Sequence, residues 1–290
     1  MQEYELSKRA GQQFRNHETR CAGRQSTAVA GFVPASFYAC VSIVLEASDL
    51  HSAGIQPSHL RVLALRFSAL APLSDAESGL LRGLAGAARS YPAFRDLRAA
   101  GMPPRLIVAG WAAQYRQLAN GQQQIVCLRL PGDFVWPLAQ FPLPSSCAVA
   151  ALTELETVDA QPLVDVLAGP AHANLAYTLR IMANLDHMLL VDQIVRLGRQ
   201  TAAERFAHLM LELHQRLGRV GLADEGCFAM LLTPEVLADV LGLSVVHVNR
   251  TVQQLRRAGL LEVRDGTVTL MQCERLQALA SWTPVGLPDR

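Results

Sequence analysis

The residues of this sequence best suited to specific chemistry lie between positions 244 and 257, and that chemistry is hydrogen bonding to nucleic-acid bases. If the segment is a helix, one of its faces carries Val246, His247, Arg250, Gln253, Gln254 and Arg257. Arginine can pair with guanine through two hydrogen bonds, glutamine can pair with adenine, and an apolar side chain can touch a thymine methyl group. The face contains no acidic residue, whereas a face that serves only solubility usually mixes Glu with Lys.

The opposite face of the segment indicates how such a helix is held. Val245, Val248, Val252 and Leu255 recur at spacings of three and four residues and predict one buried stripe. Ser244 is a favourable N-cap residue for this helix. The segment is therefore expected to be a helix with one buried face and one exposed face.

A shorter helix is predicted directly before it. Thr233 suits the N-cap, Pro234 suits the first helical position, and Gly242 can end the helix in a left-handed conformation. After the longer helix, residues 260–264 and 267–270 alternate like strands around Asp265-Gly266, a favoured type I′ turn. Helix, turn, helix and hairpin in this order predict a winged helix-turn-helix, which places its second helix in the major groove of double-stranded DNA. A helical pair and hairpin without a nucleic-acid role is the alternative.

Position within this unit suggests a role for each polar residue. Val246, His247 and Arg250 are expected to read bases. Residues at the ends of the helix, along its edge and in the hairpin are expected to contact phosphates or to form the wing: Ser244, Thr251, Gln254, Arg257 and Arg264.

Composition limits the other possibilities. The chain has 290 residues, of which 50% are hydrophobic and 18% are charged, enough for two packed domains plus an extension. Its net charge is +1, so affinity for DNA must come from a local patch, and Lys8 is its only lysine. The six cysteines form no CxxC pair, so a zinc site is not expected and a reducing cytoplasm is the simplest location. We expect no signal peptide or membrane anchor, since even the apolar run 28–45 is interrupted by Pro34.

The rest of the chain divides into regions of different pattern. Residues 1–58 show no sustained period and are expected to be a disordered or loosely docked extension. Residues 59–169 begin with two helices, expected over 60–70 and 74–88. They continue with short β-rich runs separated by turn residues, which favour a small barrel or jelly roll. The predicted strands are 105–109, 112–118, 124–130, 149–152 and 156–159.

A long helix is predicted over 170–199, and it carries two apolar stripes. One stripe can cover the β-region, and the other can pair with a second copy of the chain as a dimerisation helix. The second stripe consists of Ile181, Leu185, Met188 and Val195. A single wide stripe buried within one chain is the alternative. Thr201 then caps a further helix, which opens the region 200–290.

The order of these motifs resembles the Crp/Fnr family of transcription regulators over 60–281. The resemblance depends on Gly110-Trp111, residues 115–118, Asn120-Gly121, residues 123–130 followed by 131–134, residues 203–209, and the helix-turn-helix. It implies an α+β protein with an N-terminal jelly-roll β-barrel of the cyclic-nucleotide-binding type, a long dimerisation helix and a C-terminal winged helix-turn-helix. It further implies a cytoplasmic homodimer that binds an inverted-repeat operator, with RNA polymerase as a possible partner. Arg250 falls at the family's recurrent recognition-helix arginine.

Departures from the family pattern bear on cofactors. The cyclic-nucleotide cassette has a glutamate for the ribose and an arginine for the phosphate, but this chain has 135–137 (Val-Trp-Pro) and 145–148 (Ser-Ser-Cys-Ala) there. A buried phosphate needs a compensating cation, so cAMP and cGMP are not expected to bind. Cys21 and Cys40 do not supply the N-terminal cysteine cluster of the oxygen-sensing branch, so an iron–sulfur cluster is not expected either.

Two other classes of function are alternatives to DNA binding. A β-roll that senses a small effector, with DNA binding secondary, is the first alternative, and the missing Glu and Arg argue against a nucleotide effector. No nucleophile elbow, phosphate loop or metal-ligand spacing indicates an enzyme.

Overall fold

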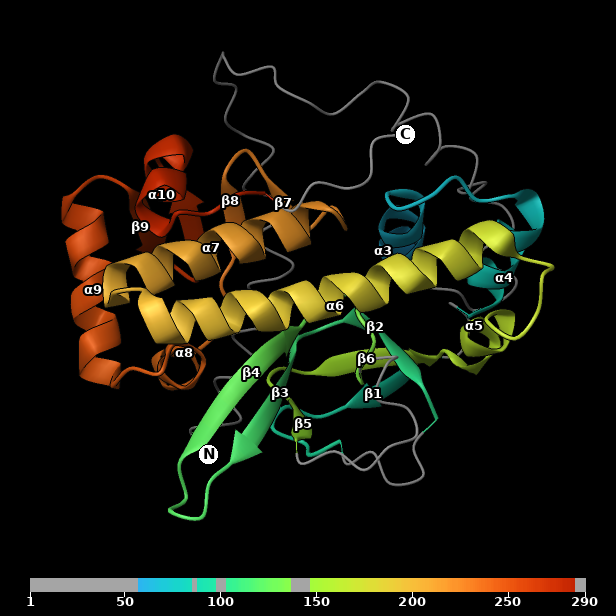
Figure 1. The fold of residues 1–290 in the computed structure, drawn as a ribbon, viewed down its shortest axis with the longest axis horizontal. Helices are drawn as coiled ribbons and strands as arrows, with labels where there is room; N and C mark the ends of the chain where they lie inside the picture. The colour runs from blue at the N-terminus through green and yellow to red at the C-terminus, as the bar shows by residue number, and fades with distance from the viewer. Residues whose placement is uncertain (1–56, 85–87, 98–102, 137–146, 285–290) are drawn as a thin grey trace.

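The computed structural model in Figure 1 describes residues 57–84, 88–97, 103–136 and 147–284. The expectations for residues 1–56 and for positions 137–146 lie outside these ranges. The described part combines a β-rich N-terminal region, a long helix and a C-terminal group of helices with a small sheet. The predicted α+β class is therefore confirmed.

The N-terminal region begins with helices and continues with short strands. Its elements are α3 (Pro57–Ser68), α4 (Asp75–Leu84), β1 (Arg89–Tyr91), β2 (Arg105–Ala109), β3 (Ala112–Gln117), β4 (Gln123–Arg129), β5 (Ala148–Ala151), β6 (Leu155–Asp159) and α5 (Gln161–Val166). The five predicted strands are present within one or two residues of their expected bounds. The strand β1 and the helix α5 are additions, and both are too short to leave a clear period in the sequence.

The described strands of this region form two antiparallel three-stranded sheets, with orders β1-β6-β2 and β4-β3-β5. They do not close into the predicted barrel, and the connections through 98–102 and 137–146 lie outside the described residues. A sharp turn at Gly110 joins β2 to β3. Its φ is 80°, and a Cβ atom there would lie 2.0 Å from the carbonyl oxygen of Glu154, so only glycine fits.

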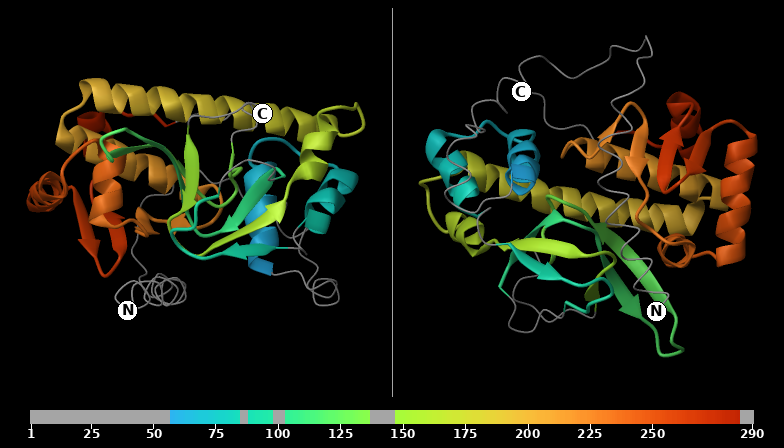
Figure 2. Two further views of the ribbon diagram at one scale, coloured as in Figure 1. Left: turned by 90° about the horizontal axis from the view of Figure 1, so that it is seen from below. Right: turned by 180° about the vertical axis from the view of Figure 1, so that it is seen from behind.

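The long helix α6 (Ala173–Arg199) runs the length of the molecule along one side (Figures 1 and 2). Leu175, Leu179 and Met182 on its inner face are buried against α3 and the β-region. The next helix, α7 (Ala202–Gly218), begins with the capping box that Thr201 predicts: the Thr201 side chain accepts from the Glu204 N–H, and Glu204 accepts from the Thr201 N–H at 2.8 Å.

The C-terminal part contains the elements α8 (Pro234–Leu241), α9 (Val245–Arg257), β9 (Leu261–Arg264) and β10 (Thr267–Leu270), as predicted. Three further elements accompany them: β7 (Ala223–Asp224), β8 (Cys227–Ala229) and α10 (Cys273–Ala280). The four strands form one sheet in the order β7-β8-β10-β9, so the hairpin is part of a larger wing.

One hydrophobic core joins this C-terminal part to the β-region. Trp111, Ile125 and Leu128 of the β-region belong to the same buried cluster as Phe206 of α7 and Val248 of α9. The core of the part predicted to bind DNA, 200–290, is therefore continuous with these side chains of the β-region.

A network of buried charges lies beside this core. Asp133, which is 6% exposed, pairs with Arg216 of α7 at 2.6 Å and with Arg66 of α3 at 3.3 Å. Arg216 also pairs with Glu212 at 2.8 Å, and Glu212 pairs with Arg196 of α6. The network connects the turn after β4 with α3, α6 and α7.

Charge pairing keeps the two carboxylates of this network ionised. Burial by itself would raise the pKa of Asp133, but the charges of Arg216, Arg66 and Arg129 outweigh it and hold that pKa below its usual value. Burial likewise opposes ionisation of Glu212, and Arg196 and Arg216 lower its pKa. Breaking such a network from one side leaves an uncompensated buried charge, which is strongly destabilising.

A second buried pair fixes β4 against α6. Arg129 is fully buried and donates to Asp186 at 2.6 Å and to the side chain of Gln114 at 2.9 Å. Asp186 therefore points into the chain and does not lie on the outer side of α6.

Within the ranges given above, no helix is both long and apolar enough to cross a membrane.

Candidate nucleic-acid interface

The first helix of the pair, α8, has the ends that its sequence predicts. The Thr233 side chain accepts from the Val236 N–H at 3.4 Å, and Pro234 occupies the first turn. Gly242 ends the helix with φ 62° and ψ 41°, in the left-handed region. The chain reverses there and enters α9 at Ser244.

Replacing Gly242 with alanine is expected to lower the free energy of unfolding by about 1–2 kcal/mol, since an L-residue is strained in this conformation. The added Cβ would also lie 3.1 Å from Leu197 Cδ2. Urea denaturation of the full chain measures the change. Gly83→Ala is the control, because Gly83 lies in α4 with nothing within 4 Å of its Cβ position, and alanine there should stabilise by about 0.5–1 kcal/mol. Equal effects of the two substitutions would contradict the strain assigned to Gly242.

The second helix, α9, shows the two faces that were expected. The Ser244 side chain caps it by accepting from the His247 N–H at 3.2 Å. Val248 and Leu255 are buried on its inner face, at 1% and 2% exposure. Figure 1 places α9 at the outer end of the molecule, away from the two sheets of the β-region.

The predicted base-reading residues are all exposed on the outer face of α9. Val246 is 69% exposed. His247 and Arg250 are exposed beside it. The structure thus leaves these three side chains available to an external ligand.

The residues predicted to contact phosphate or form the wing separate into two groups. Ser244, Gln254, Arg257 and Arg264 are exposed. Thr251 is 2% exposed and lies on the inner face between Val248 and Leu255. Its assignment as a phosphate contact was therefore wrong, because position 251 is three residues after 248 and four before 255, on the stripe that packs into the core.

The sequence reasoning missed one residue of this surface. A shallow hollow on α9 is lined by Asn249, Arg250, Gln253, Gln254 and Arg257. Asn249 had been given no role, although it is three residues from Val246 and four from Gln253, a spacing that puts all three on one face. Its amide can donate and accept, as adenine recognition requires.

The hairpin beside α9 has the predicted turn. Asp265 and Gly266 both have positive φ, 50° and 73°, as a type I′ turn requires. Arg264 is exposed next to the turn, 3.7 Å from Asp265. Exposed pairs of this kind are weak, so Arg264 can leave Asp265 for a phosphate at little cost.

The outer side of α6 forms a second exposed surface, which is apolar. The side chains on it that are 44–70% exposed are Tyr177, Met188, Val191, Ile194 and Val195. Of the four predicted dimer-helix residues, Met188 and Val195 lie here, Ile181 is half-buried, and Leu185 is only 9% exposed. Leu185 packs in the core with Leu179 and Met182, so its assignment to the dimer surface was wrong.

The position of the family's cyclic-nucleotide glutamate lies in an apolar region. Val135 is 1% exposed and belongs to a cluster with Leu97, Ile107 and Val149, and Trp136 packs against this cluster. In the described ranges, no three His, Cys, Asp or Glu side chains are grouped so that they could hold a metal.

The buried histidines of α7 have no acid–base role that the geometry supports. Burial lowers the pKa of His208 to about 4, so its ring is neutral at pH 7. Burial also lowers the pKa of His214. Both rings are packed between α7 and its neighbours and do not lie on the α9 surface.

Comparison with known proteins agrees with this geometry. Residues 204–279 match the family model of the Crp-like helix-turn-helix domain. The chain is 30% identical to the nitrogen fixation regulation protein FixK of Bradyrhizobium diazoefficiens over 179 residues, which is 60% of this chain and 73% of FixK. It is also 30% identical to FixK of Rhizobium meliloti, over 58% of this chain and 73% of that protein.

Solved structures show the same fold. The structure of FixK2 from Bradyrhizobium japonicum matches with a TM-score of 0.56 and 26% identity, over 68% of this chain and 98% of FixK2. A CooA mutant from Carboxydothermus hydrogenoformans matches with a TM-score of 0.51 and 19% identity, over 71% of this chain and 92% of CooA. The chain therefore belongs to the Crp/Fnr family of transcription regulators.

Proposed function

We propose that this family member binds an inverted-repeat DNA operator as a homodimer and regulates transcription from it. The observation that carries this proposal is the outer face of α9, which is exposed, free of acidic residues and flanked by a wing. Three arginines lie at positions 250, 256 and 257, and residues 245–257 contain no Asp or Glu. An α-helix of this kind fits the major groove, where its side chains can reach base edges and phosphates.

Eight exposed residues of the interface are given roles. Val246, His247, Asn249 and Arg250 would read bases from the N-terminal half of the helix. Ser244, Gln254, Arg257 and Arg264 would contact phosphates from its edges and from the wing. Many family members have an acidic or small polar residue just before the recognition-helix arginine, where this chain has Val246 and His247. The half-site that this protein prefers should therefore differ from the half-sites of those members.

The outer side of α6 supports the homodimer. Its residues alternate at spacings of four and three along the helix: Tyr177, Ile181, Asn184, Met188, Val191 and Val195. This is the a/d spacing of a coiled coil, so the seam can pair with a second copy of itself about a two-fold axis. Asn184, the polar member, would fix the register. Two symmetric recognition helices then require a symmetric DNA site.

The division of the chain follows from these roles. We propose a β-region sensor at 59–169, a dimerisation helix at 170–199 and a DNA-binding part at 200–290. Val135 and Trp136 fill an apolar position where a cyclic nucleotide would need a carboxylate, which favours a sensor that does not bind cAMP or cGMP. We also propose that the DNA-bound dimer contacts RNA polymerase.

Replacing Arg250 with alanine should weaken binding to the protein's preferred operator, identified by selection from a random DNA pool, by about 1–3 kcal/mol. It should also relax the base preference at one position of that operator. The physical reason is the loss of two hydrogen bonds to a base, which truncation to a methyl group cannot replace. Fluorescence anisotropy titrations on the operator and on single-base variants measure both effects. Arg275→Ala is the matched control. Arg275 is exposed on α10, so this substitution removes the same charge at a position outside α9.

Two results would contradict the assignment of Arg250. One is an unchanged affinity after Arg250→Ala. The other is an equal loss for Arg275→Ala, which would mean that net charge and not position decides binding.

A further inference from the structure

The C-terminal end of α8 is held by side chains from outside the helix-turn-helix. The last carbonyl groups of a helix have no partner within it. In α8 the carbonyl oxygens of Asp239, Val240 and Leu241 each accept a hydrogen bond from another part of the chain. The donors are Gln124 of β4 to Asp239 at 2.6 Å, Gln193 of α6 to Val240 at 2.7 Å, and Arg205 of α7 to Leu241 at 2.9 Å.

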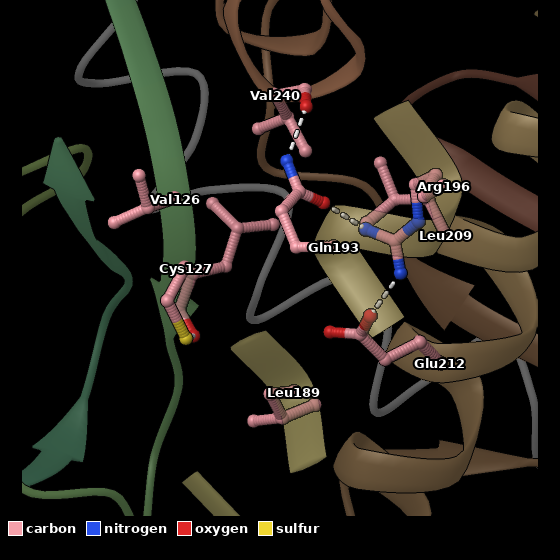
Figure 3. Close-up of a pocket in the computed structure, with 9 residues that line it drawn as sticks. Val126, Cys127, Leu189, Gln193, Arg196, Leu209, Glu212 and Val240 are labelled. Carbon is pink, nitrogen blue, oxygen red and sulfur yellow. Dashed lines mark hydrogen bonds and ion pairs between the residues drawn. The ribbon is translucent and has the colours of Figure 1, made fainter. Parts of the chain in front are cut away.

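Gln193 contacts both Val240 and Arg196, and Figure 3 shows its side chain between these two residues. It is 6% exposed, and its amide nitrogen donates both to Val240 of α8 and to the carbonyl oxygen of Ile125 in β4, at 3.2 Å. Its side-chain oxygen accepts from Arg196 at 2.7 Å, and Arg196 pairs with Glu212 of α7. One side chain therefore joins α6 to the β-region and to the helix-turn-helix, and it is oriented by the buried charge network.

The surroundings of Gln193 leave it little freedom to move. The cavity next to it has a volume of about 10 Å³, room for about one water molecule, and is lined by Cys127, Leu189, Leu209 and Val240 among others. Gln123 of β4 adds a contact to the Asp239 side chain. A buried amide with three partners in such a site has one well-defined orientation.

These contacts hold the end of α8 against α6 and β4, and together with the shared hydrophobic core they fix where α9 lies relative to α6. Only three residues, 242–244, separate α8 from α9, and the two helices share the buried core, so a shift of α8 is expected to shift α9 as well. The seam of α6 lies on the proposed two-fold axis. The position of α8 against α6 and β4 thus sets the separation of the two recognition helices in a dimer.

We propose that Gln193, assisted by Gln124 and Arg205, is a positioning residue that sets the half-site spacing of the operator. This inference rests on the proposed function, since spacing has a meaning only for a dimer on a two-part site. Gln193 touches no DNA in this arrangement. It acts on α9 through the end of α8.

The test compares variants of the full chain on a random DNA pool that contains two half-sites at variable separation. Gln193→Glu keeps the oxygen that accepts from Arg196 but puts a carboxylate opposite two carbonyl oxygens. Gln193→Met keeps the approximate shape and removes the donor. Gln124→Ala, at a half-buried position, tests the second donor with less risk to folding. Thr233→Ala is the matched control, because it removes the cap at the other end of the same helix.

The native protein should select one separation of half-sites, close to one helical turn of about 10 base pairs. The Gln193 variants should also accept separations about one base pair shorter or longer, with the preference for the native spacing reduced about tenfold, while the half-site sequence stays the same. Thr233→Ala should lower affinity without changing the spacing profile. A merely structural role of Gln193 would give the same result as Thr233→Ala.

Retention of the native spacing profile by Gln193→Glu, Gln193→Met and Gln124→Ala would overturn the inference. If Gln193→Glu does not fold, the spacing profiles of Gln193→Met and Gln124→Ala test the inference by the same criterion. A native protein that binds single half-sites as well as paired ones would overturn the proposed homodimer function, and the spacing inference would fail with it. The two failures are thus distinguished by the behaviour of the unsubstituted chain.

Discussion

Replacing Asp133 with alanine is expected to lower the free energy of unfolding by about 3–5 kcal/mol. Asp133 accepts hydrogen bonds from Arg216, from Arg66 and from the Leu130 N–H at 3.0 Å. Without its carboxylate, Arg66 and Arg216 remain buried with less opposing charge. The cost of that uncompensated charge, and not the loss of one attraction, makes the effect large.

Urea denaturation of the full chain at pH 7, followed by circular dichroism, measures the change. Glu154→Ala is the matched control, because this carboxylate is exposed and its removal should change stability by no more than about 0.5 kcal/mol. A loss below about 1 kcal/mol for Asp133→Ala would show that water or a rearranged side chain compensates the two arginines.

The difference between the native chain and Asp133→Ala should also depend on pH in a predictable direction. The folded pKa of Asp133 lies below its ordinary value: burial opposes ionisation, and the neighbouring arginines more than offset it. Its contribution to stability is therefore present above the unfolded pKa, about 3.9, and is lost as the pH falls through the folded pKa. Denaturation series at pH 7 and at pH values below about 4 should show the difference shrinking with acid.

Introducing a charge into the seam of α6 should have the largest effect on DNA binding. Val191→Glu places a carboxylate at a central a/d position of the proposed coiled coil, opposite its own copy. The chain should become monomeric, and affinity for the paired site should fall by about 10²–10⁴, because the second recognition helix no longer binds as part of the same molecule. Affinity for a single half-site should not change.

Light scattering measures the oligomeric state, and titrations on one and two half-sites measure the affinities. Met271→Glu is the matched control, since Met271 is 58% exposed against 44% for Val191 but lies after the wing and away from α6. A Val191→Glu protein that remains dimeric would place the dimer contact elsewhere.

The parts of the fold that depend on neighbouring residues could be predicted from the sequence. Thr201, Thr233 and Ser244 cap the helices that they were expected to cap, because an N-cap bonds only to the next turn. The positive φ values of Asp265 and Gly266 follow from the turn type in the same way. The strands β1, β7 and β8 were missed, since two or three residues carry no measurable alternation.

The division of a helix between inner and outer faces could be predicted only in part. The sequence of α6 carries two neighbouring apolar stripes, and nothing local says which one meets the β-region. Leu185 turned inward, and Val191 outward, because of where α3 and β4 lie. Thr251 was misassigned for a related reason, since a small hydroxyl side chain is compatible with either face of α9.

The buried charge network was beyond sequence reasoning. Asp133 lies 67 residues from Arg66 and 83 from Arg216, so no spacing rule connects them. The same holds for Gln193 and Val240, which are 47 residues apart. Such contacts depend on how the helices and sheets assemble, and a single sequence does not contain that information in readable form.

Trp111, Ile125 and Leu128 share a hydrophobic core with α7 and α9, and this core limits how the protein can be truncated or its domains exchanged. A fragment starting near residue 200 would lose these three side chains and expose the apolar surface that they cover, which favours aggregation. Fusing it to the sensor of another regulator would require transplanting the matching surface of β3 and β4 together with it. In this protein, the β-region and the helix-turn-helix therefore pack as one unit.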